Sequence, residues 1–547
     1  MFQSCTEEAA AGPLLSDVIH EVPRLLDFLY PHTAAVLAVN KALREFSHQQ
    51  PANISLWDGD DICQLTQGRC KWPQLRGLSL QSVRHFRPDH VTRLMRLPYL
   101  LSVSWPQLKS LNLSDCSLGD EDMVSFSQGS WPLLETLDLS NNGLQNHNIQ
   151  QLACANWPLL HDLNLRGSRL TTAVIPILVK SNWSLQALYL DQLDIEEDPG
   201  VGTCKQLVET QWVNLKRLHL VRCYDGGLSM LLTADWNNLQ HVCLDDNSLR
   251  SSSMMLLSEG CWPYLTSLSL RSNYITCNGM TALVKGKWPL LEALDVENND
   301  IGAPGCVALS KSTWQNLDFL NISNNFLGNT GVEHLMKANW PLLKSLCMQA
   351  VGLKEDCKVL ANSNWSELTR LHLGQNGFNF KFDEAAPRLE RLDLSENCVY
   401  SSGTHPMGYH GWGSLKRLCL SRTEGTYTDE RPPTAVCSML ECLDLSACGL
   451  VNVDSEGHIS MKLAVENLLS ACWPTMQFLK LAYCDIGSVS IKRVVSVGCN
   501  WPLLTVLDLH GNNLDSAAVS YLVTVIGHCC KPWTCLTTTW MRDQFTS

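Results

Sequence analysis

Leucine, asparagine and tryptophan recur along this chain at fixed spacings. In the stretch Trp131 to Asn156 the apolar and turn positions follow the pattern L-x-x-L-x-L-x-x-N-x-L, at Leu134, Leu137, Leu139, Asn142 and Leu144. The next stretch of this kind opens at Trp157, 26 residues later, and the same interval separates tryptophans over much of the chain. A fixed period of this length predicts stacked repeats with one continuous core, each contributing a short strand and a turn.

Seventeen repeat units can be placed between residues 51 and 526, and fifteen of them open with tryptophan. In the best-preserved units two apolar residues lie 18 and 21 positions after the tryptophan, as Ile149 and Leu152 do after Trp131. A spacing of three residues places two side chains on one helical face, so we expect a short helix on the outer side of each repeat. The tryptophans themselves are expected to stack in the buried core.

Residues 374–472 break this regularity. One unit is shortened, and stretches rich in glycine, proline, tyrosine and histidine replace the expected helices. Such inserts often form binding surfaces in repeat proteins, although neutral drift in a tolerant array is the alternative. Around the repeats we expect a disordered N-terminus at residues 1–12, a helical cap at 13–50, and a C-terminal cap or tail at 527–547.

The repeats resemble the cysteine-containing class of leucine-rich repeats, because cysteine alternates with asparagine at the turn. Cysteine takes the place of Asn142 in four units, at Cys116, Cys223, Cys448 and Cys484. The resemblance implies an α/β leucine-rich-repeat solenoid, a horseshoe with parallel strands on its concave side, helices on its outer side and a helical N-terminal cap. The better units open with Trp-Pro-x-Leu where that class has Cys-Pro-x-Leu, and this departure also makes the chain similar to ribonuclease-inhibitor-like arrays.

The segment 13–50 lacks the repeat pattern and resembles an F-box. The resemblance rests on the opening Pro13-Leu14, on the Leu-x-Phe-Leu-x-Pro sequence that ends at Pro31, and on the apolar run Val36 to Val39. It implies a surface that docks the adaptor Skp1 of cullin-based ubiquitin ligases, formed here by Leu26, Phe28, Leu29, Pro31, Val36 and Leu37. A cap that only covers the apolar end of the array is the alternative.

Net charge and cysteine content limit the classes of binding partner and the cellular compartment that we expect. A formal net charge of −13 and a pI near 5.6 disfavour nucleic acid and anionic membranes as partners. The start of the chain has no basic stretch ahead of an apolar one, and no apolar run is long enough to cross a bilayer. We therefore expect a cytoplasmic or nuclear protein whose 24 cysteines are reduced thiols.

No sequence motif for catalysis, nucleotide binding or metal binding stands out. The chain is therefore predicted to bind a partner rather than to catalyse a reaction, and to need no cofactor or metal. One alternative concerns the C-terminal tail, where zinc ligands are offered by His528, Cys529, Cys530 and Cys535. An untidy terminal cap is the simpler interpretation of that cluster.

Residues that flank the strand leucines should face the concave side, where a protein partner would bind. The central strands place aromatic and basic side chains there, and these are predicted to form a partner-binding hot spot: Tyr189, Arg217, His219, Arg222 and His241. Solubilising surface charge without a partner is the alternative. The following strands are acidic around one arginine and then basic again, at Asp245, Asp246, Arg271, Asp295, Glu297, Arg370, His372, Arg391, Arg417 and Arg422.

Rows of arginine suit an extended acidic or phosphorylated segment, since a guanidinium group grips carboxylate or phosphate with two hydrogen bonds. The favoured function is therefore substrate recognition for a cullin-type (SCF) ubiquitin ligase, in which residues 13–50 bind Skp1 and the concave face selects a protein. A stand-alone interaction scaffold or inhibitor of the ribonuclease-inhibitor type, with no ligase role, is the alternative. Binding of Skp1 separates the two hypotheses.

Overall fold

The computed structural model describes residues 53–55, 75–79, 105–129, 131–171, 173–191, 214–222, 236–260, 262–354, 365–377, 388–397, 413–423, 439–448, 451–453, 459–461, 473–484, 486–487, 501–512 and 514–516. The predicted segments 1–12, 13–50 and 527–547 lie outside the described residues, and with them the expected adaptor-binding residues and the cysteine cluster of the tail. The chain divides into two compact units, one made of Met1–Asn142 and Gln151–Leu160, the other of Gly143–Gln150 and His161–Ser547.

The first unit contains parallel strands paired in sequence order. They are β1 (Asn53–Ser55), β2 (Gly77–Ser79), β3 (Ser110–Asn112) and β4 (Thr136–Asp138). After β3 comes the helix α6 (Asp120–Ser127), which buries Phe126. Trp131 stacks on Trp105 and on Trp157, with ring centroids 6.5 and 5.7 Å apart, and Phe126 meets Trp131 edge-on. Stacked tryptophans therefore form the core of this unit, as predicted.

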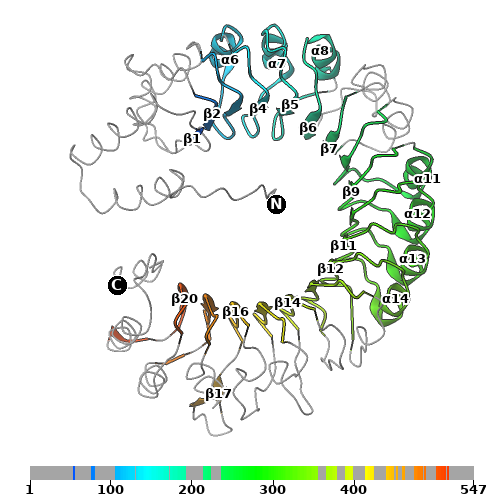
Figure 1. Ribbon diagram of the computed structural model, residues 1–547, viewed down its shortest axis with the longest axis vertical. Helices are drawn as coiled ribbons and strands as arrows, with labels where there is room; N and C mark the ends of the chain where they lie inside the picture. The colour runs from blue at the N-terminus through cyan, green and yellow to red at the C-terminus, as the bar shows by residue number, and fades with distance from the viewer. Residues whose placement is uncertain are drawn as a thin grey trace. The chain divides into compact units, whose positions relative to one another are not determined.

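The second unit has the same strand design (Figure 1). Its parallel strands pair in sequence order: β5 (Asp162–Asn164), β6 (Ala187–Asp191), β7 (Arg217–Val221), β8 (His241–Cys243), β9 (Ser267–Ser269), β10 (Ala293–Asp295), β11 (Phe319–Asn321), β12 (Ser345–Cys347), β13 (Arg370–His372), β14 (Arg391–Asp393), β15 (Arg417–Cys419), β16 (Cys442–Asp444), β19 (Phe478–Lys480) and β20 (Val506–Asp508). A separate antiparallel pair is formed by β17 (Val451–Val453) and β18 (Ile459–Met461). Strand pairing thus continues from β13 to β16 through the irregular region, whose residues 378–387, 398–412 and 424–438 lie outside the described part.

Short helices cover one side of these strands (Figure 1): α7 (Asn146–Leu152), α8 (Val174–Lys180), α11 (Ser251–Glu259), α12 (Thr276–Leu283), α13 (Gly302–Leu309) and α14 (Gly328–Leu335). The predicted apolar pairs are buried, since Met280 and Leu283 of α12 have no exposed surface. Neighbouring helices approach closely through glycine. A Cβ atom on Gly331 of α14 would lie 3.0 Å from Ala303 Cα of α13, so a larger residue would push the helices apart.

Buried asparagine closes the turn after each regular strand. The Asn325 side chain donates hydrogen bonds to the backbone carbonyls of Val296 and Ile322, at 2.8 and 3.0 Å. Its Oδ1 atom accepts from the backbone N–H of Asn299 in the preceding repeat, at 2.9 Å. One side chain thus satisfies backbone groups of two repeats that would otherwise be buried without partners.

Where cysteine replaces this asparagine, its thiol donates a hydrogen bond to a backbone carbonyl but does not replace the asparagine acceptor. Cys448 Sγ lies 2.7 Å from the backbone carbonyl of Leu420, and the Cys484 thiol lies 3.1 Å from the carbonyl of Leu445. A thiol has no acceptor comparable to the asparagine carbonyl, so these turns hold fewer hydrogen bonds. The interpretation as buried free thiols is confirmed at Cys116, Cys448 and Cys484, while Cys223 lies outside the described residues.

The tryptophans of the second unit also stack inside the core. Trp288 lies on Trp314 and Trp340 on Trp365, with centroid distances of 6.0 and 6.1 Å. Together with the parallel strands and the helices on one side, this core confirms the predicted α/β leucine-rich-repeat solenoid. Among the described residues, every helix is too short or too polar to span a membrane.

Candidate functional site

The strands of the second unit present one face away from the helices, which we call the open face (Figure 1). Each three-residue strand of this sheet except β20 buries its middle residue, so the first and third side chains lie on this face. Residue-by-residue pairing aligns them into a first row and a second row across the sheet. The first row is Asp162, Ala187, Arg217, His241, Ser267, Ala293, Phe319, Ser345, Arg370, Arg391, Arg417 and Cys442; the second is Asn164, Tyr189, His219, Cys243, Ser269, Asp295, Asn321, Cys347, His372, Asp393, Cys419 and Asp444.

The predicted hot spot is a cluster of mixed charge centred on His219. Tyr189 and His219 are register partners on β6 and β7, with ring centroids 6.1 Å apart. Arg166, which follows β5, lies 5.3 Å from the Tyr189 ring centroid and brings its Nη2 atom within 2.8 Å of His219 Nε2. Asp191 Oδ1 lies 3.1 Å from the same imidazole nitrogen. Two of these four residues, Arg166 and Asp191, were not part of the predicted set.

The other predicted residues differ in their surroundings. Arg217 Nη2 lies 2.9 Å from Asp162 Oδ2, so its charge is compensated. Partial burial and the charge of Arg217 lower the pKa of His241, which leaves that ring neutral at pH 7. Arg222 is exposed in the bend after β7, and no described residue forms an ion pair with it. The cluster thus carries less positive charge than the sequence suggested, and its role in partner binding stays a prediction.

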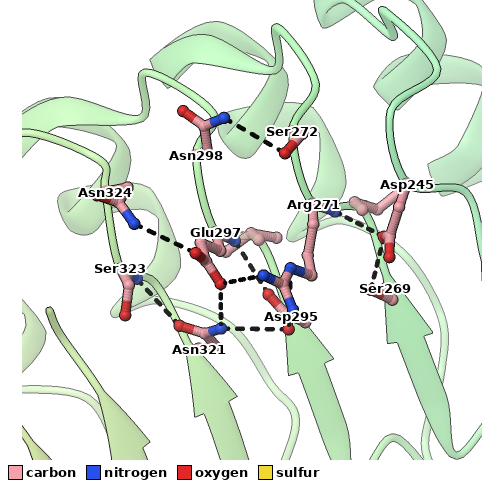
Figure 2. Close-up of polar contacts among 12 residues, drawn as sticks. Asp245, Ser269, Arg271, Ser272, Asp295, Glu297, Asn298, Asn321, Ser323 and Asn324 are labelled. Carbon is pink, nitrogen blue, oxygen red and sulfur yellow. Dashed lines mark hydrogen bonds and ion pairs between the residues drawn. The ribbon is translucent and has the colours of Figure 1, made fainter. Parts of the chain in front are cut away.

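A second cluster, the carboxylate network, lies on β9 to β11 and in the turns that follow β8 to β11 (Figure 2). Arg271 Nη2 lies 2.8 Å from Glu297 Oε2, and Arg271 Nε lies 3.9 Å from Asp295 Oδ2. Asn321 donates to both carboxylates, at 3.0 and 3.2 Å, and Asp245 accepts from the backbone N–H of Arg271 at 2.8 Å. These groups satisfy one another's hydrogen bonds, so the network orders the middle of the open face. With three carboxylates around one arginine, it remains more acidic than basic.

Asp295 is the most perturbed carboxyl group of the network. Burial raises its pKa from 3.8 to about 6, and the hydrogen bond from the Glu297 backbone and the charge of Arg271 offset only part of this effect. The side chain therefore takes up a proton near pH 6, well above the ordinary range for aspartate.

The cysteine thiols of the second row are expected to be unreactive. Burial raises the pKa of Cys243 and of Cys347 to about 12, and that of Cys419 to about 11. Thiols that remain protonated at pH 7 are poor nucleophiles and poor metal ligands. Within the described residues, no three histidine, cysteine, aspartate or glutamate side chains are arranged to hold a metal ion. That the chain is not an enzyme stays a prediction.

Three arginines lie side by side in the first row, and we call them the arginine row. Arg370 on β13 is the register partner of Arg391 on β14, which in turn is paired with Arg417 on β15. All three side chains are exposed. Burial of part of the guanidinium and repulsion by its two neighbours lower the pKa of Arg391. Among the described residues, none of the three arginines forms an ion pair.

Most carboxylates around the arginine row pair with side chains outside the row. Six carboxylates lie in the described residues between 365 and 448, and Glu441 alone among them lacks a partner there. The five pairs are Glu367 with Arg388, Glu390 with Lys416, Glu396 with Arg422, Asp393 with His372 and Asp444 with Lys480. Glu390 and Glu441 attract Arg391, but they offset only part of the effect of burial and of the two flanking arginines. The row therefore keeps positive charge and forms no ion pair among the described residues, in contrast to Arg217 and Arg271.

The sequence predicted these arginines as basic residues of the concave face but placed the hot spot elsewhere. A signal was available, because Arg-Leu-x-Leu recurs in three successive units, beginning at Arg370, Arg391 and Arg417. Their freedom from carboxylates depends on contacts between repeats, which the sequence does not reveal.

Comparison with known proteins agrees with this architecture. Residues 106–127 and 289–310 match the family described as Leucine Rich repeat. These two segments are leucine-rich repeats, in agreement with the fold. No curated protein sequence matches it.

Several solved structures resemble this leucine-rich-repeat protein. The crystal structure of the mouse RP105/MD-1 complex contains a chain that superposes with a TM-score of 0.50 at 18% identity, over 84% of this chain and 79% of that chain. The TLR13-ssRNA13 complex gives a TM-score of 0.43 at 17% identity, over 87% and 76% of the two chains. An internalin (inlF) from Listeria monocytogenes gives 0.37 at 20% identity, over 55% and 76%. At these identities the likeness concerns the fold alone.

Proposed function

We propose that this leucine-rich-repeat protein binds a protein partner through its open face and acts as the substrate-recognition subunit of a cullin-type (SCF) ubiquitin ligase. The observation that supports the binding half is the arginine row. It consists of three exposed cations in register, without ion pairs among the described residues, on a face where neighbouring charges are paired. Positive charge that the protein itself leaves uncompensated suits an acidic partner, because charge complementarity favours association.

The ligase half of the proposal rests on the F-box resemblance of residues 13–50. The residues proposed to dock Skp1 are apolar or proline: Leu26, Phe28, Leu29, Pro31, Val36 and Leu37. The proposed location in the cytoplasm or nucleus agrees with the ten described cysteines, all of which are free thiols. A protein rather than a nucleic acid or a membrane is proposed as the partner, because the chain carries a net charge of −13.

Capture of purified Skp1 by the full-length chain tests the ligase half. We expect the wild-type chain to retain Skp1, and the variant Phe28→Glu to lose it, since a buried charge in an apolar docking surface is costly. The variant Arg391→Glu serves as the control, because it changes the open face and should leave Skp1 capture unchanged. No capture by the wild-type chain would overturn the ligase assignment and favour the stand-alone scaffold or inhibitor.

A further inference from the structure

The arginine row has a defined length and position. Its three residues occupy the first positions of β13, β14 and β15, and adjacent strands lie about 4.8 Å apart. Neutral side chains end the row on both sides, Ser345 on β12 and Cys442 on β16. The three guanidinium groups thus start from adjacent strands, and their side chains are long enough to meet in a small volume above β14.

The surroundings leave this volume electropositive. Glu390 and Glu396 of the β14 repeat pair with Lys416 and Arg422, at 3.1 and 3.2 Å. Burial and repulsion from Arg417 and Arg370 lower the pKa of Arg391, and the attraction of Glu390 and Glu441 offsets only part of this effect. An anion bound above the row would relieve the repulsion between the arginines. A cationic row of this kind differs from ordinary surface charge, which proteins usually intersperse with the opposite sign.

We propose that Arg370, Arg391 and Arg417 form a subsite for one phosphate group carried by an extended segment of a phosphorylated protein. The inference rests on the proposed protein-binding role of the open face, and it does not require the ligase assignment. A phosphorylated side chain brings a charge of about −1.5 to −2 and three acceptor oxygens, enough for two or three guanidinium groups at once.

The spacing of the row favours phosphate over a string of carboxylates. Side chains on one side of an extended segment recur every two residues, or roughly 6.6 Å, whereas the arginines recur with the strand spacing of about 4.8 Å. The carboxylates of successive aspartates or glutamates would therefore not align with the three arginines. One dianion placed above Arg391 meets all three cations without any such match.

The same face disfavours a continuous polyanion such as RNA. Beside the arginine row, the second row places Asp393 and Asp444 on β14 and β16. Three strands before β13, the second row carries the carboxylate of Asp295 on β10. A nucleic acid that extends beyond three strands would meet these carboxylates, while a peptide with a single phosphate need not.

An oriented library of phosphoserine peptides with degenerate flanking positions tests the inference. The library and its unphosphorylated counterpart are passed over the immobilised full-length chain, and the retained peptides are quantified by mass spectrometry. We expect at least tenfold enrichment of phosphorylated peptides on the wild-type chain, and about tenfold weaker retention by Arg391→Glu and Arg391→Gln. Arg391→Lys should retain an intermediate amount, because lysine keeps the charge but loses the planar fork.

Matched controls make the outcome decisive. Arg250→Glu makes the same charge change at an exposed arginine at the N-cap of α11, away from the arginine row, so it should leave phosphopeptide retention unchanged. Circular dichroism of each variant establishes that the fold is retained. Equal retention of both libraries by the wild-type chain, or equal losses for Arg250→Glu and Arg391→Glu, would overturn the inference. So would tighter, Arg391-dependent binding of a twelve-nucleotide RNA. Skp1 capture uses a different surface, so its failure leaves this result interpretable.

Discussion

Arg217 Nη2 and Asp162 Oδ2 lie 2.9 Å apart, although the strands that carry them, β7 and β5, are separated by β6. The residue between them in the first row is Ala187, whose small side chain is fully buried. Arginine can therefore reach across one strand to an aspartate two repeats away. This pairing removes much of the charge that the sequence assigned to the predicted hot spot.

We predict that Arg217→Ala changes the free energy of unfolding by less than about 1 kcal/mol, because exposed ion pairs contribute little in water. Urea denaturation of the wild type and the variant measures the difference. A loss of several kcal/mol would contradict this account and would mean that Arg217 holds β5 to β7 together.

Replacing a ladder asparagine should be far more damaging. Asn325 is fully buried, and its removal leaves the carbonyls of Val296 and Ile322 and the N–H of Asn299 without partners. We expect Asn325→Ala to cost about 3 kcal/mol or more in urea denaturation. The control Asn278→Ala changes an exposed helical asparagine and should be within about 0.5 kcal/mol of the wild type. Similar effects of the two variants would argue against the ladder.

Close packing of the outer helices gives a third prediction. A Cβ on Gly331 would lie 3.0 Å from the backbone of Ala303, so Gly331→Ala should force α13 and α14 apart and lower the melting temperature. The cost of about 1–3 kcal/mol outweighs the gain of about 1 kcal/mol that alanine normally brings to a helix. Gly413→Ala is the control, because nothing lies within 4 Å of a Cβ at that position. A stabilised Gly331→Ala variant would refute the close approach.

Asp295 should make stability depend on pH. Since its pKa is raised from 3.8 to about 6, the folded chain keeps a proton that the unfolded chain releases between those values. Stability from this group is therefore present below about pH 4 and is lost as pH rises through about 6, by up to about 3 kcal/mol. Asn cannot ionise, so Asp295→Asn should gain stability relative to the wild type between pH 4.5 and pH 7, measured by urea midpoints. A difference that does not vary with pH would refute the raised pKa.

The sequence was sufficient to predict the repeating framework. The pattern at Leu137, Leu139 and Asn142 constrains strand, turn and register, because each position has one burial requirement that recurs in every unit. It also predicted which side chains share a face, including Arg217 and Arg391. The sequence could not predict their different electrostatic states, since the reach of Arg217 to Asp162 depends on a small residue in the intervening strand. The predicted adaptor site at 13–50 lies outside the described residues and stays a prediction.

The reactivity of individual arginines tests the central claim most directly. Phenylglyoxal modifies accessible guanidinium groups, and mass spectrometry follows each site with and without the retained phosphoserine peptides. In the free chain we predict that Arg370, Arg391 and Arg417 react faster than the paired Arg217 and Arg271, and that phosphopeptides protect only the three residues of the arginine row. Slow reaction of the row in the free chain, or protection centred on Arg217 instead, would contradict the account.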